Sequence, residues 1–443
     1  MFQKLNAWFY KPVDNSPLVL FRAFFGFLLF AEAFGAIVTG WVTRTFVETK
    51  ITIPFLGFDW IAEFIHGPTA YVWYSALAVL GLMIMVGYKY KWSTLLYGFM
   101  WWAVYLSQKT HYNNHYYLMV IMCFLMFLLP AHRAFSFDAL KSKIRKHSTP
   151  NWVYILLIGL FWIVYSFASI NKIYDDWLEA IPISIWFKQK EHFWLVGPLL
   201  AKEWMPWLIS YGGIVFDGLI IPALLWKRTR WWAFGLNLFF HLFNSAVFHI
   251  GVFPYMMIAI TVLFFPPEQV RSFFFRAKPS LTNLKPYSWK SNSGITLAVI
   301  AFLLLNAVYP LRHYLMEGHV NYTEEGHRMS WRMMLRAKGG TIFFWIKNPE
   351  TKEKEMLDLK KYFNRRQIST LATHPDATYW FVQKLKEEYK TKGIENPIIT
   401  ARARVRLNRK PYFHLYDPQL NLAEVEWSHL KHNAWVLYPG KEE

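Results

Sequence analysis

The sequence predicts an α-helical polytopic membrane bundle of about nine spans, followed by a β-rich soluble C-terminal domain. Hydrophobic residues make up 54% of the 443 residues and charged residues 17%, whereas soluble domains carry about 25% charged residues. Uncharged apolar runs of about twenty residues, the length that a membrane-crossing helix needs, recur through the first 310 residues. No such run follows. We therefore divide the chain into a transmembrane bundle, residues 1–310, and a water-facing domain, residues 311–443.

Nine apolar segments each predict one helix that crosses the membrane. They are residues 17–40, 69–88, 92–108, 115–131, 152–174, 207–226, 231–249, 253–267 and 294–310. The N-terminus lacks the layout of a signal peptide, and the first apolar segment contains Arg22 and Glu32. We therefore expect the first span to be retained in the mature protein.

Basic residues predict the orientation of this bundle. Groups of Lys and Arg precede the first span and follow the second, fourth, sixth and eighth spans. If nine helices cross, these five groups share one side. Basic loops stay in the cytoplasm, so the N-terminus is expected to be cytoplasmic and the C-terminal domain extracytoplasmic or lumenal. The net charge of +19 is then explained by topology and anionic membrane lipid, and we expect no nucleic-acid partner.

The C-terminal domain shows alternating strand patterns. Gly340–Ile346 and Ile398–Leu407 read as strands, and Ala377–Glu388 reads as a helix. These strands predict a domain rich in β-structure, and a small β-sandwich is one architecture that would accommodate them. Alternate residues Arg402, Arg404 and Arg406 would share one strand face. That face is either a solvated surface or a surface for an acidic polypeptide.

Several chemistries find no support in the sequence. The single cysteine, Cys123, excludes a disulfide within the chain and a thiolate metal cluster. No compact His, Asp and Glu spacing indicates a metal site, so none is expected. Phosphate-binding glycine loops, dinucleotide-binding glycine patterns and a nucleophilic-serine elbow are also lacking.

Ionisable and strongly polar residues inside the spans are candidates for function, because lipid makes them costly. These residues are Arg22, Glu32, His115, Lys172, Asp217, His241 and Asn244. We expect Arg22 and Asp217 to form a structural ion pair. His241 and Asn244 lie about one helical turn apart and share a face, where they form either an interhelical hydrogen bond or part of a site.

Lys172 ends the fifth span, in the stretch Phe161–Trp177. A lysine at that place is either an anchor that reaches the lipid headgroups or a base in a dry pocket. With nine spans, Asn114, His115, Lys172 and His241 converge on the outer half of the bundle, next to the C-terminal domain. Anchoring residues would be spread over both sides, so this convergence favours a site.

An ordered set of motifs carries a family resemblance. The motifs are Phe21-Arg22 with Phe25-Gly26, Asn113-Asn114-His115 with Tyr117-Leu118, Lys172 with Asp176-Trp177, Phe216-Asp217, then His241, Asn244, Phe248, Ile250-Gly251, Phe253 and Tyr255, and finally Asn321, Ser330-Trp331 and Met333-Met334. Over roughly residues 17–340 the chain resembles the vitamin K-dependent γ-glutamyl carboxylase family. The short outer domain and the single cysteine resemble a bacterial-type member.

The resemblance implies a specific reaction. A reduced vitamin K, or a menaquinone-type hydroquinone, is oxidised by O2 to its epoxide, and the strong base so generated removes a γ-proton from a glutamate of a protein or peptide. CO2 then adds, which gives γ-carboxyglutamate. No metal is implied.

The same resemblance assigns roles to residues. Lys172 would accept the quinol proton, and His115 with Asn114 would donate hydrogen bonds to developing negative charge. His241 and Asn244 would support the cofactor, and Trp331, Met333 and Met334 would pack against its ring or else dock the outer domain onto the bundle.

Two other function classes stay open. One is a quinone-binding membrane epoxidase or sensor that lacks carboxylation. The other is a transporter with Lys172, Asp217 and His241 as a relay, although inverted repeats that would favour it are not evident.

Overall fold

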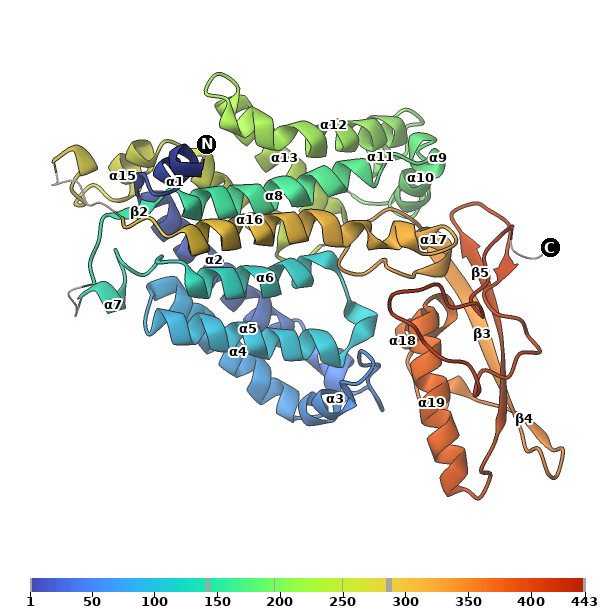
Figure 1. Cartoon of the computed structure of the whole chain (residues 1–443). Helices are drawn as coiled ribbons and strands as arrows, with labels where there is room; N and C mark the ends of the chain where they lie inside the picture. Colours follow the sequence, from blue (N-terminus) through green and yellow to red (C-terminus); the bar gives the residue numbers. More distant parts are fainter. Residues whose placement is uncertain (1, 141–143, 195, 249, 284–288, 441–443) are drawn as a thin grey trace.

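A bundle of long helices and a smaller C-terminal domain make up the computed structural model of the chain (Figure 1). The structure describes residues 2–140, 144–194, 196–248, 250–283 and 289–440. The N-terminus lies at one end of the bundle and the C-terminal domain at the other, as Figure 1 shows.

The bundle is almost entirely helical. Its helices are α1 (Phe2–Phe9), α2 (Ser16–Val38), α3 (Asp59–Ile65), α4 (Thr69–Val86), α5 (Tyr90–Ser107), α6 (Asn114–Leu128), α7 (Phe137–Leu140), α8 (Trp152–Ile170), α9 (Asp175–Leu178), α10 (Ile181–Lys188), α11 (Gly197–Leu200), α12 (Met205–Leu225), α13 (Arg230–Phe248), α14 (Phe253–Ala259), α15 (Pro267–Phe274) and α16 (Ser293–Val308). Shorter turns of helix are η1 (Thr43–Val47), η2 (Lys109–His111), η3 (Ile260–Phe264), η4 (Leu281–Asn283) and η5 (Tyr309–Leu315). Strands β1 (Pro12–Asp14) and β2 (Ser148–Pro150) pair antiparallel at the N-terminal end.

Five helices are long and apolar enough to cross a membrane: α2, α4, α8, α12, and α16 continued by η5. Each of the nine predicted segments overlaps a helix, but nine spans are not confirmed. The apolar helices α6 and Phe253–Phe264 are short. At 1.5 Å per residue, the 15 residues of α6 reach only about 22 Å, less than the hydrocarbon core of a bilayer. Position 249, the last of the predicted segment 231–249, lies outside the described residues.

Two glycines let α2 and α4 touch backbone to backbone. A Cβ built on Gly26 would lie 2.2 Å from the backbone nitrogen of Met85, and one on Gly81 would lie 2.5 Å from that of Phe30. Any larger residue would force these helices apart, which is how small residues allow close packing between membrane helices.

The predicted ion pair between Arg22 and Asp217 is wrong. The Arg22 guanidinium donates to the carbonyls of Ala131, Ala134 and Phe135, at 3.3, 3.4 and 2.7 Å. The loop after α6 folds beneath α2 and offers these carbonyls, so Arg22 needs no carboxylate. Asp217 has another partner, described below.

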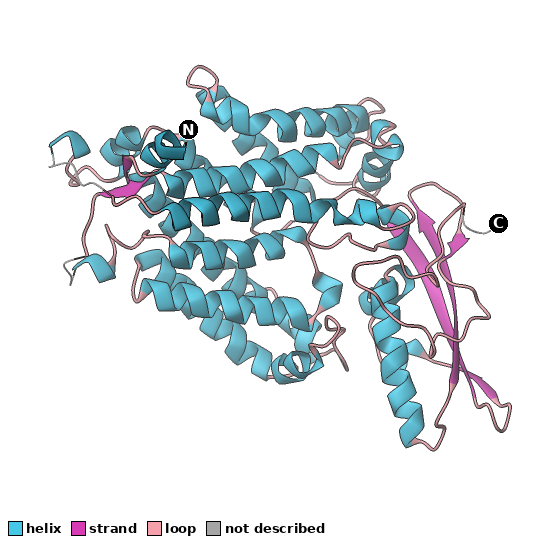
Figure 2. Ribbon diagram, in the orientation of Figure 1, coloured by secondary structure: helices cyan, strands magenta, loops and turns pink. Residues whose placement is uncertain are grey.

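The C-terminal domain contains one antiparallel sheet in the order β4-β3-β5-β6 (Figure 2). Its elements are α17 (Val320–Thr323), β3 (Lys338–Lys347), β4 (Lys354–Met356), η6 (Leu359–Lys361), α18 (Arg365–Thr373), α19 (Pro375–Thr391), β5 (Ile398–Leu407) and β6 (Phe413–His414). Strands β3 and β5 pair over their whole length, with Lys338 opposite Leu407 and Lys347 opposite Ile398. The predicted strands and helix are confirmed.

The domain contains the predicted sheet, but the small sandwich considered as its form is wrong, because the second layer is helical. Ile342 and Phe344 of β3 and Ala401 of β5 face a core that they share with Phe381 and Leu385 of α19. The amphipathic face of α19 therefore covers one face of the sheet and takes the place of a second sheet.

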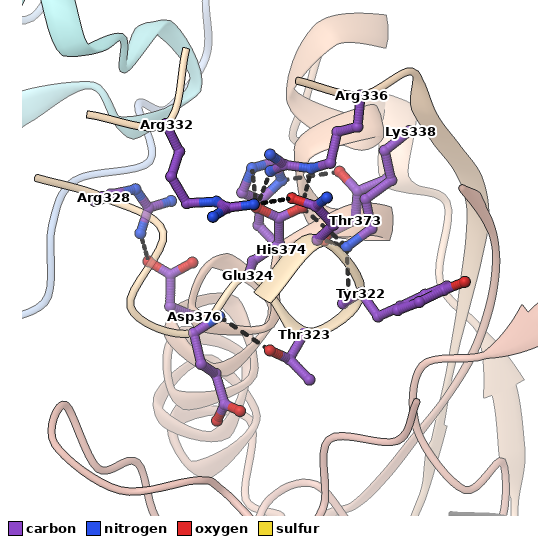
Figure 3. Close-up of polar contacts among 12 residues, drawn as sticks. Tyr322, Thr323, Glu324, Arg328, Arg332, Arg336, Lys338, Thr373, His374 and Asp376 are labelled. Atoms are coloured by element: carbon purple, nitrogen blue, oxygen red, sulfur yellow. Dashed lines mark hydrogen bonds and ion pairs between the residues drawn. The ribbon is translucent and has the colours of Figure 1, made fainter. Parts of the chain in front are cut away.

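A buried ion pair links the C-terminal domain to the bundle, and further buried pairs surround it within the domain. Asp376, at the start of α19, accepts from Lys109 of the bundle at 2.7 Å and from Arg328. Burial alone would raise the pKa of Asp376, but Arg328 and Lys109 outweigh it and hold that pKa well below its usual value. Figure 3 shows the neighbouring part of this cluster, in which Glu324 pairs with Arg336 and, at 3.0 Å, with Lys338. The domain is thus held on the bundle by the Lys109–Asp376 pair, whose side chains are 0% and 10% exposed and are therefore little screened by water.

Candidate functional site

A pocket with a cavity volume of about 100 Å³, partly open to the outside, lies between α8, α12, α13, α14 and the short helix α10. Most of its lining is apolar. It brings together six of the eight predicted site residues, namely His115, Lys172, His241, Asn244, Met333 and Met334. Asp217 adds a carboxylate to this set. A pocket with a few polar groups in an apolar wall is the usual form of a small-molecule site.

Lys172 forms an ion pair with Asp217 in this pocket. Helix α8 ends at Ile170, Asn171 caps it, and Lys172 follows directly. The side chains of Lys172 and Asp217 are 12% and 7% exposed. Gly213, about one turn before Asp217 on α12, leaves room for the lysine: a Cβ there would lie 3.9 Å from Lys172 Cε. The amine is therefore enclosed and has a counter-ion at contact.

His115 stacks on an aromatic ring at the first turn of α6. Its ring centroid lies 3.7 Å from that of Phe253, with the two planes at 15°. Asn113 caps this helix by accepting from the backbone N–H of Tyr116 at 2.8 Å, which fixes where His115 points. Within the described part of the chain no hydrogen bond holds the His115 ring nitrogens, so an N–H can face the pocket.

His241 is held by a short chain of hydrogen bonds. The Tyr165 hydroxyl lies 2.8 Å from His241 Nε2 and donates to Asn237 Oδ1 at 3.3 Å. Asn237 in turn donates to the carbonyl of Met257 at 3.5 Å. A hydroxyl has one proton, so donation to Asn237 leaves Tyr165 as acceptor and assigns the His241 proton to Nε2. No hydrogen bond to Nδ1 of His241 occurs within the described ranges, so this nitrogen can accept one from a ligand.

Asn114 and Trp331 lie outside the pocket lining. Asn114 donates to the carbonyl of Arg332 at 2.7 Å and accepts from the Tyr112 hydroxyl at 3.0 Å. Trp331 is 1% exposed and packs on Tyr117 with ring centroids 5.0 Å apart. For Trp331 the geometry is that of docking between the outer segment and the bundle.

Sequence reasoning missed the partners of the predicted residues. Asp217 was noted but assigned to Arg22, and Tyr165 was not noted. Glu32 was noted without a partner. Its Oε1 accepts from the Tyr116 hydroxyl at 2.7 Å, and its Oε2 would lie 3.6 Å from a Cβ on Gly251. Glu32 thus contacts a neighbour of His115 and the turn that leads into Phe253.

Comparison with known families covers most of the chain. Residues 10–268, more than half of the sequence, match the family described as HTTM domain. Residues 291–442 match the family described as vitamin K-dependent gamma-carboxylase, lumenal domain. The chain belongs to the vitamin K-dependent gamma-carboxylase family. No solved structure was found to match it.

Membership of the gamma-carboxylase family implies a vitamin K cofactor and glutamate-containing protein substrates. The apolar helices indicate integration into a membrane. The pocket fits the chemistry of a reduced quinone, because aromatic and aliphatic walls surround a few groups that can exchange protons with its hydroxyls. No group of three or more His, Cys, Asp or Glu side chains suited to a metal occurs among the described residues.

Proposed function

We propose that this protein is an integral-membrane naphthoquinol-dependent γ-carboxylase and epoxidase. It couples the oxidation of reduced vitamin K, or a menaquinone-type hydroquinone, by O2 to the carboxylation of protein glutamate to γ-carboxyglutamate. Residues 1–310 form the catalytic bundle and residues 311–443 the outer domain. The N-terminus is cytoplasmic, and the pocket and outer domain are extracytoplasmic. The observation that carries the proposal is the Lys172–Asp217 pair in an apolar pocket with His115 and His241.

The Lys172–Asp217 pair acts as the proton acceptor for the quinol. The amine acts in its neutral form, and the contact between the two side chains keeps the ionised Asp217 carboxylate beside it. That amine takes the hydroxyl proton, and Asp217 stabilises the positive charge that results. A neutral lysine in an apolar site is a competent general base.

The two histidines have complementary roles. His115, held by its stack on Phe253, donates an N–H to an oxygen that gains negative charge. His241, with its proton on Nε2, accepts at Nδ1. Asn244 supports this end of the pocket, and Met333 and Met334 pack against the ring. When bound, the reduced quinone and O2 supply the base that removes the glutamate γ-proton, which no side chain is strong enough to do.

One assay tests the proposal. Purified protein receives reduced vitamin K, O2, labelled CO2 and a glutamate-containing peptide. We expect vitamin K epoxide and labelled peptide. Epoxide without label would replace the proposal by an epoxidase or sensor, and the absence of both products would refute it.

A lysine substitution tests the base. We expect Lys172→Ala to lose epoxide formation at neutral pH and an added small amine to restore part of it. The matched control is Lys202→Ala, which removes an exposed lysine between α11 and α12. Full activity in Lys172→Ala would show that the base lies elsewhere.

A further inference from the structure

The sheet of the C-terminal domain has one covered face and one open face. Along β5, Ala401, Ala403 and Val405 are buried against the helices, while Arg402, Arg404 and Arg406 are exposed. Residues directly opposite across a ladder share a face, so the register defines an outer face. Its side chains are Thr341, Phe343, Trp345, Lys347, Lys354, Met356, Ile398, Thr400, Arg402, Arg404, Arg406 and His414.

The outer face is strongly cationic. It carries three arginines and two lysines. The structure describes every residue of these strands, and none of the side chains on this face is acidic. No ion pair to these arginines occurs among the described residues. The Arg406 guanidinium donates to the carbonyls of Lys410 and Arg409, at 3.1 and 3.3 Å, which leaves its charge without a counter-ion. Such a face attracts a polyanion.

Aromatic rings hold these cations in place and supply apolar area. Tyr412 is 55% exposed, and the Arg404 and Arg406 guanidinium carbons lie 5.4 and 5.8 Å from its ring centroid. Lys354 lies 5.4 Å from the ring centroid of Trp345, and Phe343 is 47% exposed. A cationic side chain that already packs on an aromatic ring loses less conformational entropy on binding a ligand than a mobile surface lysine does.

The arginine row ends beside the pocket. The turn after β5 contacts α9 and α10, the short helices beside the pocket. Asn408 donates to Asp176 of α9 at 2.6 Å, and Arg409 donates to Ser184 of α10 at 3.0 Å. Lys410 pairs with Asp176 at 3.2 Å. The residue after Asp176 is Trp177, which lines the pocket, as Ile183 next to Ser184 does.

We propose that the outer face binds an acidic, glutamate-rich segment of the polypeptide substrate in extended form and leads it to the pocket. This inference rests on the proposed function and adds to it a binding surface for the polypeptide substrate. Alternate residues on a strand lie about 7 Å apart on one face, so alternate glutamates of an extended peptide match Arg402, Arg404 and Arg406 in spacing. The exposed rings between the cations receive the apolar side chains of such a peptide.

Direct binding tests this surface independently of catalysis. The probe is a fluorescein-labelled 20-residue peptide of Glu-Ala-Glu-Leu repeats, titrated with full-length protein in detergent while anisotropy is recorded. The variants are the triple changes R402E/R404E/R406E and, because acidic residues could disturb the sheet, R402Q/R404Q/R406Q. The matched control is K360E/K361E/K390E, which reverses three exposed lysines elsewhere on the same domain. Thermal unfolding verifies the fold of each variant.

We expect both arginine variants to weaken binding by about tenfold or more, since three exposed ion pairs are lost together, and the wild-type affinity to fall as salt is raised. The lysine control should bind within about twofold of wild type. Equal binding by the arginine variants would overturn the proposal. So would equal affinity of the wild type for a Gln-for-Glu peptide, or tighter affinity for single-stranded DNA, or a dimer that dissociates in R402Q/R404Q/R406Q. If the wild type binds the peptide, the arginine variants do not, and the wild type makes no epoxide, this surface is supported and the proposed reaction is refuted.

Discussion

Replacing Asp217 by Asn should separate the charge of this residue from its shape. The substitution keeps the size of the side chain and removes the counter-ion of Lys172, whose side chain is 12% exposed. The positive charge that Lys172 gains when it accepts a proton would then have no carboxylate at contact. Asp217→Asn therefore acts on the product of the proton transfer more than on the binding of quinol.

The expected size of the effect follows from the burial of the pair. Removing one partner of a buried ion pair typically costs about 3 kcal/mol or more, because the remaining charge is left unpaired. At 1.4 kcal/mol per factor of ten, that cost lowers kcat/KM for epoxide formation about 100-fold at pH 7.

The assay measures epoxide formation from reduced vitamin K between pH 5 and 9 for wild type and Asp217→Asn. The bundle offers a matched control, because Asp14 and Lys278 form a second buried Lys–Asp pair at the N-terminal end. Asp14→Asn should lower the thermal unfolding temperature to a similar extent and leave the pH–rate profile in place. Epoxide formation by Asp217→Asn at the wild-type rate and with the wild-type profile would refute the role of Asp217.

Two further predictions concern other parts of the molecule. Glu32→Ala should raise KM for quinol about tenfold, because it frees the His115–Phe253 stack. Glu32→Gln still accepts a hydrogen bond from Tyr116 and should keep a KM close to that of the wild type. Equal KM values in the two variants would contradict this role of Glu32. Burial lowers the pKa of His374 to about 4, against the pull of Glu324, while the unfolded chain titrates near 6.5. The contribution of neutral His374 to the free energy of unfolding is therefore fully present above pH 6.5, and it declines by up to about 3 kcal/mol as the pH falls to 4. Thermal unfolding across this range measures the slope, which His374→Gln should flatten.

Much of the fold could be predicted because its signals are local. Apolar runs located the helices of the bundle, and period-two alternation located β3 and β5 with the exposed row of arginines. Nine spans are not confirmed, because apolarity identifies buried helices and crossing helices alike and length must separate them, as α6 shows. A sandwich was considered because the strands could be recognised in the sequence, whereas the packing of α19 against the sheet could not.

The members of the site could be predicted, but their pairing could not. A polar residue in an apolar run is visible in sequence because lipid makes it costly. Its partner depends on helix rotation and on loops that return to the bundle. Arg22 illustrates this, since backbone carbonyls after α6 satisfy it and leave Asp217 to Lys172. Tyr165 escaped notice because a tyrosine in an apolar helix resembles any core aromatic.

The segment between η5 and β3 joins the outer domain to the pocket. Arg332 is buried and donates to Asn171, next to Lys172, at 3.1 Å, and to Asn321 at 3.0 Å. Trp331 and Met334 both adopt left-handed backbone conformations, with φ of 54° and 48°, which side chains other than glycine rarely do. Such conformations persist only where surrounding contacts impose them, and here the contacts come from both the bundle and the outer domain. Met333 and Met334 reach the pocket as a result, so the wall of the pocket is completed by the way the outer domain docks, and a bundle without that domain would lack it.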